Sequence, residues 1–139
     1  MVPLCAEEGI GLLPWSPLAG GVLAGSREAG TTRSQGPMGG GRYTRPADLA
    51  VIEAVKQVAE ARGETPAQVA LAWLLSKPGV TAPIIGVTKL SQLEDPIKAV
   101  ETTLSAEEIK LLEAPYLAQK PTSLPRPFDA PMGAPRPKE

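Results

Sequence analysis

The sequence predicts an α/β fold whose parallel sheet is incomplete. Two short apolar runs of strand length, Ile10–Trp15 and Thr81–Ile85, alternate with several helical patterns. That alternation is typical of parallel strands joined by right-handed crossovers. Two parallel strands leave two unpaired edges and bury little apolar surface, so the chain is expected to be a portion of a larger domain.

The bulk composition is that of a globular domain and gives no sign of several partner classes. The chain has 139 residues, 42% of them apolar, and a net charge of −1, which indicates neither nucleic acid nor an anionic membrane as a partner. No apolar run approaches the ~20 residues of a membrane span, and the N-terminus lacks the pattern of an export signal. The single cysteine, Cys5, cannot form an internal disulfide, so a cytoplasmic location is expected. No cluster has metal-ligand spacing.

The N-terminal third predicts a helix end, a strand and a long loop. Residues 1–8 read as the end of a helix, and Gly9 suits the left-handed position after it. The strand Ile10–Trp15 follows, and it ends in small and polar residues. Residues 26–45 form a loop with five glycines and four arginines, of a length that is usually functional or disordered. The arginines of this loop could contact a phosphate, but solvated side chains are the favoured interpretation for each one. They are Arg27, Arg33, Arg42 and Arg45.

Two helices with clear end signals come next. Apolar residues at helical spacing predict a helix over 46–62, which Gly63 ends. Thr65 and Gln68 have the spacing of a capping box and open a second helix. Residues 69–75 are apolar on every side, so this helix is expected to be heavily buried.

The C-terminal third predicts a strand, two short helices and a tail. After the strand Thr81–Ile85, one helix is expected between Leu90 and Val100. Ser105 and Glu108 form another capping box, which opens a helix to about residue 113. Seven prolines fall in the last 25 residues, and such a segment buries too little apolar surface to order itself. We therefore divide the chain into a domain over 1–118 and a tail over 119–139.

Four motifs, in one consistent order, carry a family resemblance. They are MVPLCAEEGIGLLPWSPLAGG at 1–21, QVALAWLLS at 68–76, PIIGVTK at 83–89 and QLED at 92–95. Together they resemble the aldo-keto reductases over residues 1 to about 116. The resemblance is strongest to the bacterial branch that includes relatives of the potassium-channel β-subunits. The resemblance implies a (β/α)8 barrel of which this chain is the C-terminal portion, about strands 7 and 8 with their helices. Met1 matches an internal helix position of that family.

The resemblance also implies an NADP(H) site at the ends of the two predicted strands. Trp15 matches the aromatic residue that stacks on the nicotinamide, where the alternative is a core tryptophan. Ser16, Leu18 and Gly20 match positions that wrap the pyrophosphate, where the alternative is a plain strand-to-loop turn. Many relatives carry a basic residue at the position of Gly20.

The second half of the implied site follows the second strand. Gly86, Thr88 and Lys89 match the site for the adenosine 2′-phosphate, which favours NADP over NAD; the alternative for Lys89 is an ordinary surface lysine. Gln92 and Asp95 match adenine-side contacts. The next residue, Pro96, departs from the family pattern and either kinks the helix or restarts it with Asp95 as N-cap.

The catalytic groups of the family do not match this chain. In the family a tyrosine, an aspartate, a lysine and a histidine lie in the part that precedes these motifs, and this chain has no histidine and only two tyrosines, Tyr43 and Tyr116. Neither tyrosine has the context of the catalytic one, so no catalytic residue is assigned. The tail after Tyr116 lacks the histidine that relatives often carry, so no particular carbonyl substrate is predicted.

Three functional interpretations remain open from the sequence. The first is a member of an NADP(H)-dependent carbonyl reductase family whose full-length members act on small carbonyl compounds, here without its catalytic groups and inactive alone. The second is a non-catalytic module that binds a nucleotide or completes a barrel with another polypeptide. The third is a non-functional remnant.

Overall fold

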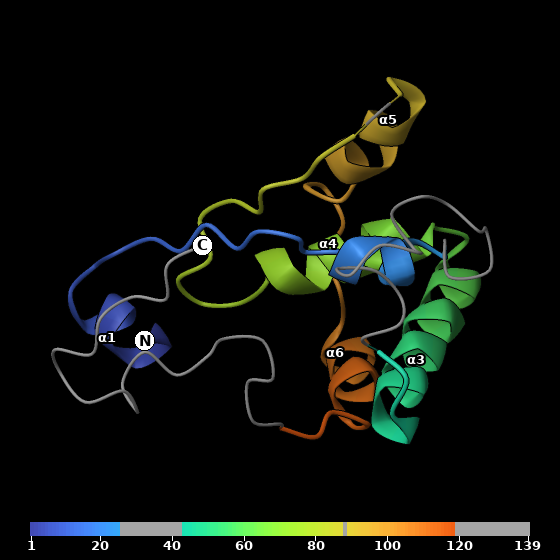
Figure 1. The fold of residues 1–139 in the computed structure, drawn as a ribbon, viewed down its shortest axis with the longest axis horizontal. Coiled ribbons are helices and arrows are strands. Elements are labelled where there is room, and N and C mark those ends of the chain that lie inside the picture. The colour runs from blue at the N-terminus through green and yellow to red at the C-terminus, as the bar shows by residue number, and fades with distance from the viewer. Residues whose placement is uncertain (26–42, 88, 119–139) are drawn as a thin grey trace, which may run out of the picture.

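The computed structural model describes residues 1–25, 43–87 and 89–118, and this part of the chain is mostly helical. Figure 1 shows the helices labelled α3, α4 and α6 gathered in a cluster, the one labelled α5 projecting from it, and α1 at the far end of an extended pair of segments. The elements are α1 (Val2–Glu7), the 3₁₀ helix η1 (Ala19–Ala24), α3 (Pro46–Arg62), α4 (Pro66–Leu75), α5 (Ser91–Lys98) and α6 (Ala106–Glu113).

The core lies among α3, α4 and α6, with η1 against it. The side chains of Val69 and Leu71 on α4 are 0% and 1% exposed, and Val58 on α3 is 2% exposed. Burying one such aliphatic side chain stabilises the fold by about 1.5–3 kcal/mol. The predicted burial of α4 is confirmed as far as Ala72, but Trp73, the next residue, is only half-buried, although it still packs against the core.

The predicted helix ends are confirmed in detail. Thr65 Oγ1 accepts from the Gln68 backbone N–H at 3.2 Å, and Gln68 Oε1 accepts from the Thr65 N–H at 2.7 Å. Ser105 and Glu108 repeat this exchange at the start of α6, at 3.2 and 2.7 Å. Gly63 ends α3 with a φ of 66°, a left-handed conformation that a side chain would strain.

The two predicted strands are wrong as regular strands: no strand longer than a single bridge forms in the residues that the structure describes. The two segments nevertheless run parallel and touch at two bridges, Leu12 to Val80 and Trp15 to Ile84. The Thr81 N–H donates to the Leu12 carbonyl at 2.9 Å. The pairing is therefore in place, but the ladder is not continuous.

Proline explains the interruption. Pro14 and Pro83 have no backbone N–H, so neither can donate to the facing segment. Ile84, one residue later, donates to the Pro14 carbonyl instead, at 2.8 Å. As a result Trp15 lies three positions after Leu12, whereas Ile84 lies four positions after Val80, and the second segment carries one extra residue, as in a β-bulge.

An arginine fixes α6 against the junction of α3 and α4. Arg62 Nη1 donates to both carboxylate oxygens of Glu108, at 3.0 and 3.2 Å, and its Nη2 donates to Glu64 at 3.0 Å. The Ser105 backbone N–H, and then Arg62, hold the pKa of Glu108 below its ordinary value. The two carboxylates raise the pKa of Arg62. The guanidinium at the end of α3 thus joins α6 and the turn that leads into α4.

Arg45 has a defined partner at the start of α3. Its Nε and Nη2 donate to the Asp48 carboxylate at 3.0 and 2.5 Å, and the Arg45 backbone N–H donates to the same group. The hydrogen bond from Arg45 lowers the pKa of Asp48. Arg45 is thus part of the helix cap. The other loop arginines named above, together with Thr88 and the tail 119–139, lie outside the described residues.

No helix in the described part of the chain combines the length and apolar character that crossing a bilayer needs.

Candidate cofactor site

The parallel pairing brings the ends of the two extended segments together. Trp15 faces Ile84 at the second bridge. The residues that follow Trp15 and those that follow Ile84 therefore leave the pair at the same end. The turn that begins at Ser16 and the segment that begins at Gly86 are therefore neighbours, although about 70 residues separate them in the chain. The ends of parallel strands are where phosphate-bearing ligands bind in α/β folds.

The turn after Trp15 has an unusual backbone. Ser16 and Ala19 have φ values of 52° and 51°, although both carry side chains, and Gly20 and Gly21 follow at 68° and 96°. Residues with side chains seldom adopt positive φ, and such strain often marks a functional turn. Leu18, with a φ of −99°, separates Ser16 from the run of three left-handed residues that begins at Ala19.

Glycine is favoured at two of these positions. At Gly20 and Gly21 a β-branched or bulky side chain would be strained by the positive φ. The turn is held by its own hydrogen bonds: the Ala19 N–H donates to Ser16 at 3.0 Å, and the Gly21 N–H donates to Leu18 at 2.9 Å. The family motif in the sequence indicates the small residues here, but not the left-handed backbone at Ser16.

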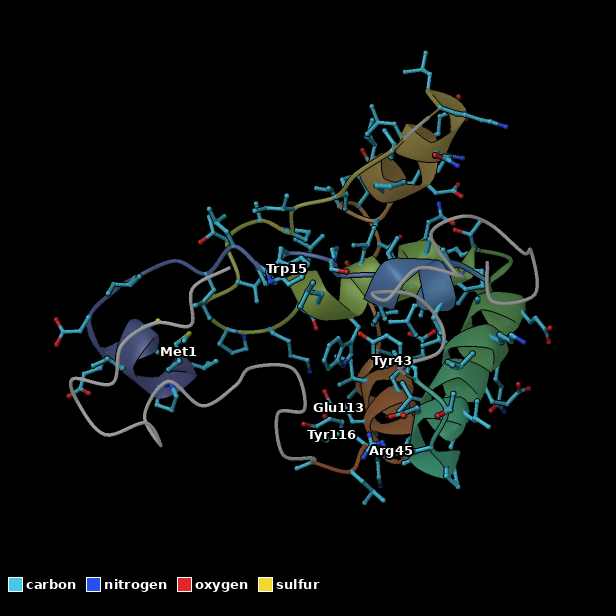
Figure 2. All side chains as sticks on the ribbon, in the orientation of Figure 1. Met1, Trp15, Tyr43, Arg45, Glu113 and Tyr116 are labelled. Atoms are coloured by element: carbon cyan, nitrogen blue, oxygen red, sulfur yellow. The ribbon has the colours of Figure 1, made fainter. Side chains whose placement is uncertain are left out.

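The aromatic ring at the head of this turn is open to solvent. Trp15 is 67% exposed and Ile84, beside it, is 56% exposed. Figure 2 shows Trp15 on the extended pair near α4, away from the labelled tyrosines. In the structure of this chain the Trp15 side chain is therefore accessible to solvent.

The second half of the predicted site leads into α5. Gly86 and Lys89 are exposed, and the Lys89 backbone N–H donates to Gln92 Oε1 at 3.3 Å, so Gln92 contacts the residue just before the helix. Asp95 is half-buried within α5, and its carbonyl accepts from the Ala99 N–H at 3.1 Å. The helix runs through Pro96 to Lys98, so the expected alternative of a restart with Asp95 as N-cap is wrong.

The structure thus brings some predicted residues together and leaves others apart. Trp15, Ser16 and Gly86 lie at the shared end of the paired segments. Leu18 and Gly20 lie in the turn that follows, where Leu18 packs against the helical core. Gln92 and Asp95 belong to α5, which projects from the cluster and packs on α4.

One cluster of polar side chains was not predicted from the sequence. The Trp73 indole N–H donates to Glu113 Oε1 at 3.0 Å, and the Lys77 ammonium pairs with the same oxygen. That ammonium also lies over the Trp73 ring, 4.8 Å from its centroid. The Lys77 hydrogen bond, followed by that of Trp73, lowers the pKa of Glu113. Lys77 lies four positions after Trp73, just beyond the Ser76 C-cap of α4, and this spacing could have indicated their contact.

Comparisons with known proteins agree with the motifs. The model of the aldo/keto reductase family matches residues 1–116, and the chain belongs to this family. It is 40% identical to a putative aryl-alcohol dehydrogenase of Schizosaccharomyces pombe over 84% of this chain and 33% of that protein. It is 37% identical to a versiconal hemiacetal acetate reductase of Aspergillus parasiticus over 84% of this chain and 35% of that protein.

Two further matches extend the comparison. A probable voltage-gated potassium channel β-subunit of Arabidopsis thaliana is 37% identical over 72% of this chain and 33% of that protein. Among solved structures, a thermostable aldo-keto reductase in complex with the inhibitor epalrestat aligns with a TM-score of 0.56 and 28% identity, over 83% of this chain and 33% of that one. The chain spans about a third of the length of the curated relatives it matches.

Proposed function

We propose that this chain is the cofactor-binding part of an NADP(H)-dependent carbonyl reductase of the aldo-keto reductase family. It would correspond to about the seventh and eighth strands of a (β/α)8 barrel, with their helices. The observation that supports this most is the parallel pairing of Trp15 with Ile84, which puts the turn after Ser16 beside the segment after Gly86. In the proposed site these two segments hold opposite ends of one nucleotide.

Each half of the site has a physical task in this proposal. The exposed face of Trp15 would stack on the nicotinamide and fix which side of the ring meets a carbonyl. Ser16, Leu18 and Gly20, in the turn with positive φ at Ser16 and Gly20, would approach the pyrophosphate with backbone N–H groups and the Ser16 hydroxyl. Lys89, exposed beside the start of α5, together with Gly86 and Thr88, would hold the 2′-phosphate, and Gln92 and Asp95 would contact the adenine side.

The cofactor, when bound, would supply the hydride, and the chain's own residues would only bind and orient it. Reduction of a carbonyl also needs a general acid within hydrogen-bond reach of the substrate oxygen. The chain has no histidine, and Tyr43 and Tyr116 belong to the region around the start of α3 and the end of α6. The chain alone is therefore proposed to be inactive, with the small carbonyl substrate and the general acid belonging to the complete enzyme, and the cytoplasm as its location.

A titration of the whole chain with NADPH and NADH tests the cofactor assignment. NADPH should bind more tightly, and Lys89→Met should weaken NADPH binding by about tenfold while leaving NADH unchanged, because only NADPH carries the 2′-phosphate. Lys98→Met, at the exposed end of α5, is the matched control. Equal loss for both nucleotides would contradict the role of Lys89, and turnover of 4-nitrobenzaldehyde by the chain alone would contradict its proposed inactivity.

A second candidate function is a module that completes a barrel with another polypeptide. The observation that favours it is the row of exposed apolar side chains on the paired segments: Ile10, Leu13, Trp15, Ile84 and Val87 are 41–67% exposed. Co-expression with the first two-thirds of one of the relatives above tests it. Recovery of NADPH-dependent turnover in a co-purified complex would support this function, and two proteins that elute separately would contradict it.

A further inference from the structure

A half-open apolar cavity lies behind the proposed cofactor turn, among η1, α3, α4 and α6. Its volume is about 370 Å³, within the range of small-molecule sites. Leu23, Val51, Val55 and Leu74 are among its apolar walls, and Pro17, two residues after Trp15, also lines it. Trp15 does not line it, so the cavity is separate from the face on which a nicotinamide would stack.

A smaller hollow adjoins this cavity. It measures about 200 Å³ and shares Leu23, Val51 and Tyr116 with the larger one. Leu23 and Val51 make up the aliphatic floor that the two hollows share, and Tyr116 makes up the aromatic rim. The arginine that borders the smaller hollow, Arg45, is held by Asp48, so its charge is compensated within the chain. The combined apolar lining therefore favours an uncharged ligand that excludes water from these walls.

The lining of the larger cavity includes one charged side chain. Glu113 and Tyr116 are exposed residues of the lining, and with the half-buried Trp73 they mark the solvent side of the cavity, which we call its mouth. The donors of Trp73 and Lys77 both use Glu113 Oε1, which leaves the lone pairs of Oε2 for a further donor. The pKa of Glu113 is lowered by these contacts, so the group is a carboxylate at neutral pH. It can accept a hydrogen bond from a ligand but cannot give one.

The charge balance at the mouth decides what kind of donor fits. Lys77 already neutralises Glu113, so a cationic ligand would gain little and would have to displace that ammonium. An anionic ligand would meet the carboxylate and an apolar wall. A neutral hydroxyl can bond to the second carboxylate oxygen without disturbing Lys77, and an acidic hydroxyl does so most strongly.

From these features we propose that the cavity is a binding site for a small phenol with an apolar substituent. The hydroxyl donates to Glu113 at the mouth, the ring lies between the aromatic rims of Trp73 and Tyr116, and the apolar substituent fills the space over Leu23 and Val51. The assignment does not depend on the cofactor proposal, because no residue of the cofactor site takes part apart from the neighbouring wall at Pro17.

Calorimetric titration of the whole chain with 4-propylphenol at pH 7 tests the proposal. Submillimolar, saturable binding is expected. The isostere 4-propyltoluene, which has no donor, should bind about tenfold more weakly, and 4-propylbenzoate should not bind. Equal binding of the phenol and the toluene, or tighter binding of the benzoate, would overturn the assignment of a phenol.

Two variants and a control locate the site. Val51→Phe fills the shared floor and should abolish binding, whereas Val100→Phe, the same change at a position that is 73% exposed, should leave it intact. Glu113→Gln should remove the difference between the phenol and the toluene. Unchanged phenol affinity in Val51→Phe would overturn the site. Because the chain has two tryptophans, the fluorescence of Trp73 in a Trp15→Phe background provides a second readout.

The same samples separate the other occupants. If a second copy of the chain filled the cavity, the protein would elute as a dimer that Val51→Phe dissociates, and this result would overturn the small-molecule assignment. A monomer whose Trp73 emission shifts on adding 4-propylphenol, with no shift for the benzoate, supports it.

Discussion

The helical cluster and the paired extended segments are built in opposite ways. In the cluster of α3, α4 and α6, aliphatic side chains are fully enclosed, as at Val69 and Leu71. Along the pair 10–15 and 81–87, large apolar side chains face solvent, and two bridges and a few hydrogen bonds join the segments. The cluster therefore holds its own packing, while the pair carries the candidate site with little packing of its own.

Stability and the candidate site are therefore divided between the two regions of the chain. The core that surrounds α4 supplies the apolar burial that a folded unit needs. The paired segments expose apolar side chains and carry a strained turn at Ser16, which destabilise a free domain but suit a binding or assembly site. Changes in the two regions should accordingly have different consequences.

The largest effect is expected from a matched pair of leucine truncations. Leu71→Ala, at a side chain that is 1% exposed, should lower the free energy of unfolding by about 3 kcal/mol, because it leaves a cavity in the core. Leu13→Ala, at a side chain that is 58% exposed, should change it by less than about 0.5 kcal/mol. Urea denaturation followed by circular dichroism measures both, and equal losses would contradict the division.

A smaller effect is expected from the start of α4. Thr65→Ala removes the side-chain acceptor of the Gln68 N–H and should cost about 1 kcal/mol. Thr44→Ala, at an exposed position before α3, is the matched control and should be neutral. The same denaturation experiment measures the difference. If Thr65→Ala were neutral, the capping box would not contribute to the stability of the cluster.

Acid should weaken the cluster through its carboxylates. The pKa values of Glu108 and Glu113 are lowered from the ordinary 4.5, so the stability that their contacts add is fully present above about pH 4.5 and is lost as the pH falls through the folded values. Both groups are near the surface, so the loss should be modest and should shrink in salt. Thermal melting between pH 7 and pH 3 checks this.

A matched pair of variants assigns the acid effect. Glu113→Gln should flatten part of the pH dependence, whereas Glu101→Gln, at an exposed position after α5, should leave it unchanged. If the melting temperature fell equally with acid in both variants, Glu113 would not be responsible for the pH dependence of stability.

The smallest effect on global stability is expected at Gly11, where the change is local. A β-carbon at this position would collide with the Thr81 side chain, so Gly11→Ala should push the paired segments apart and weaken the bond from the Thr81 N–H to Leu12. Hydrogen exchange at Thr81 should accelerate while the unfolding of the cluster stays within about 0.5 kcal/mol. Adding Thr81→Ala should slow the exchange again, and an unchanged exchange rate in Gly11→Ala would contradict the close approach.

Local signals in the sequence predicted the helices well because each helix end depends on a few adjacent residues. The capping boxes at Thr65 and Ser105 and the left-handed Gly63 are all set within three or four positions. The regular strands were wrong because a ladder depends on the facing segment as well. Pro14 and Pro83 each seemed compatible with a strand taken singly, but together they remove the donors that a continuous ladder needs.

The candidate site divides in the same manner. The small residues after Trp15 could be identified from the motif, whereas the positive φ of Ser16 and Ala19 could not, because neither residue type requires it. The contact of Trp73 with Glu113 joins helices that lie 40 positions apart in the sequence, and no local spacing predicts that distance. Of the cofactor residues, Thr88 lies outside the described residues, and the remaining roles stay predictions.

The extra residue beside Pro83 changes which face of the paired segments the later side chains occupy. Side chains of an extended segment alternate between two faces, so one inserted residue shifts that alternation by half a period. Everything from Ile84 onward is thereby turned to the face opposite the one that an uninterrupted pairing from Val80 would give. The two prolines thus determine which face of the pair carries the Ile84 side chain at the end where the Ser16 turn begins.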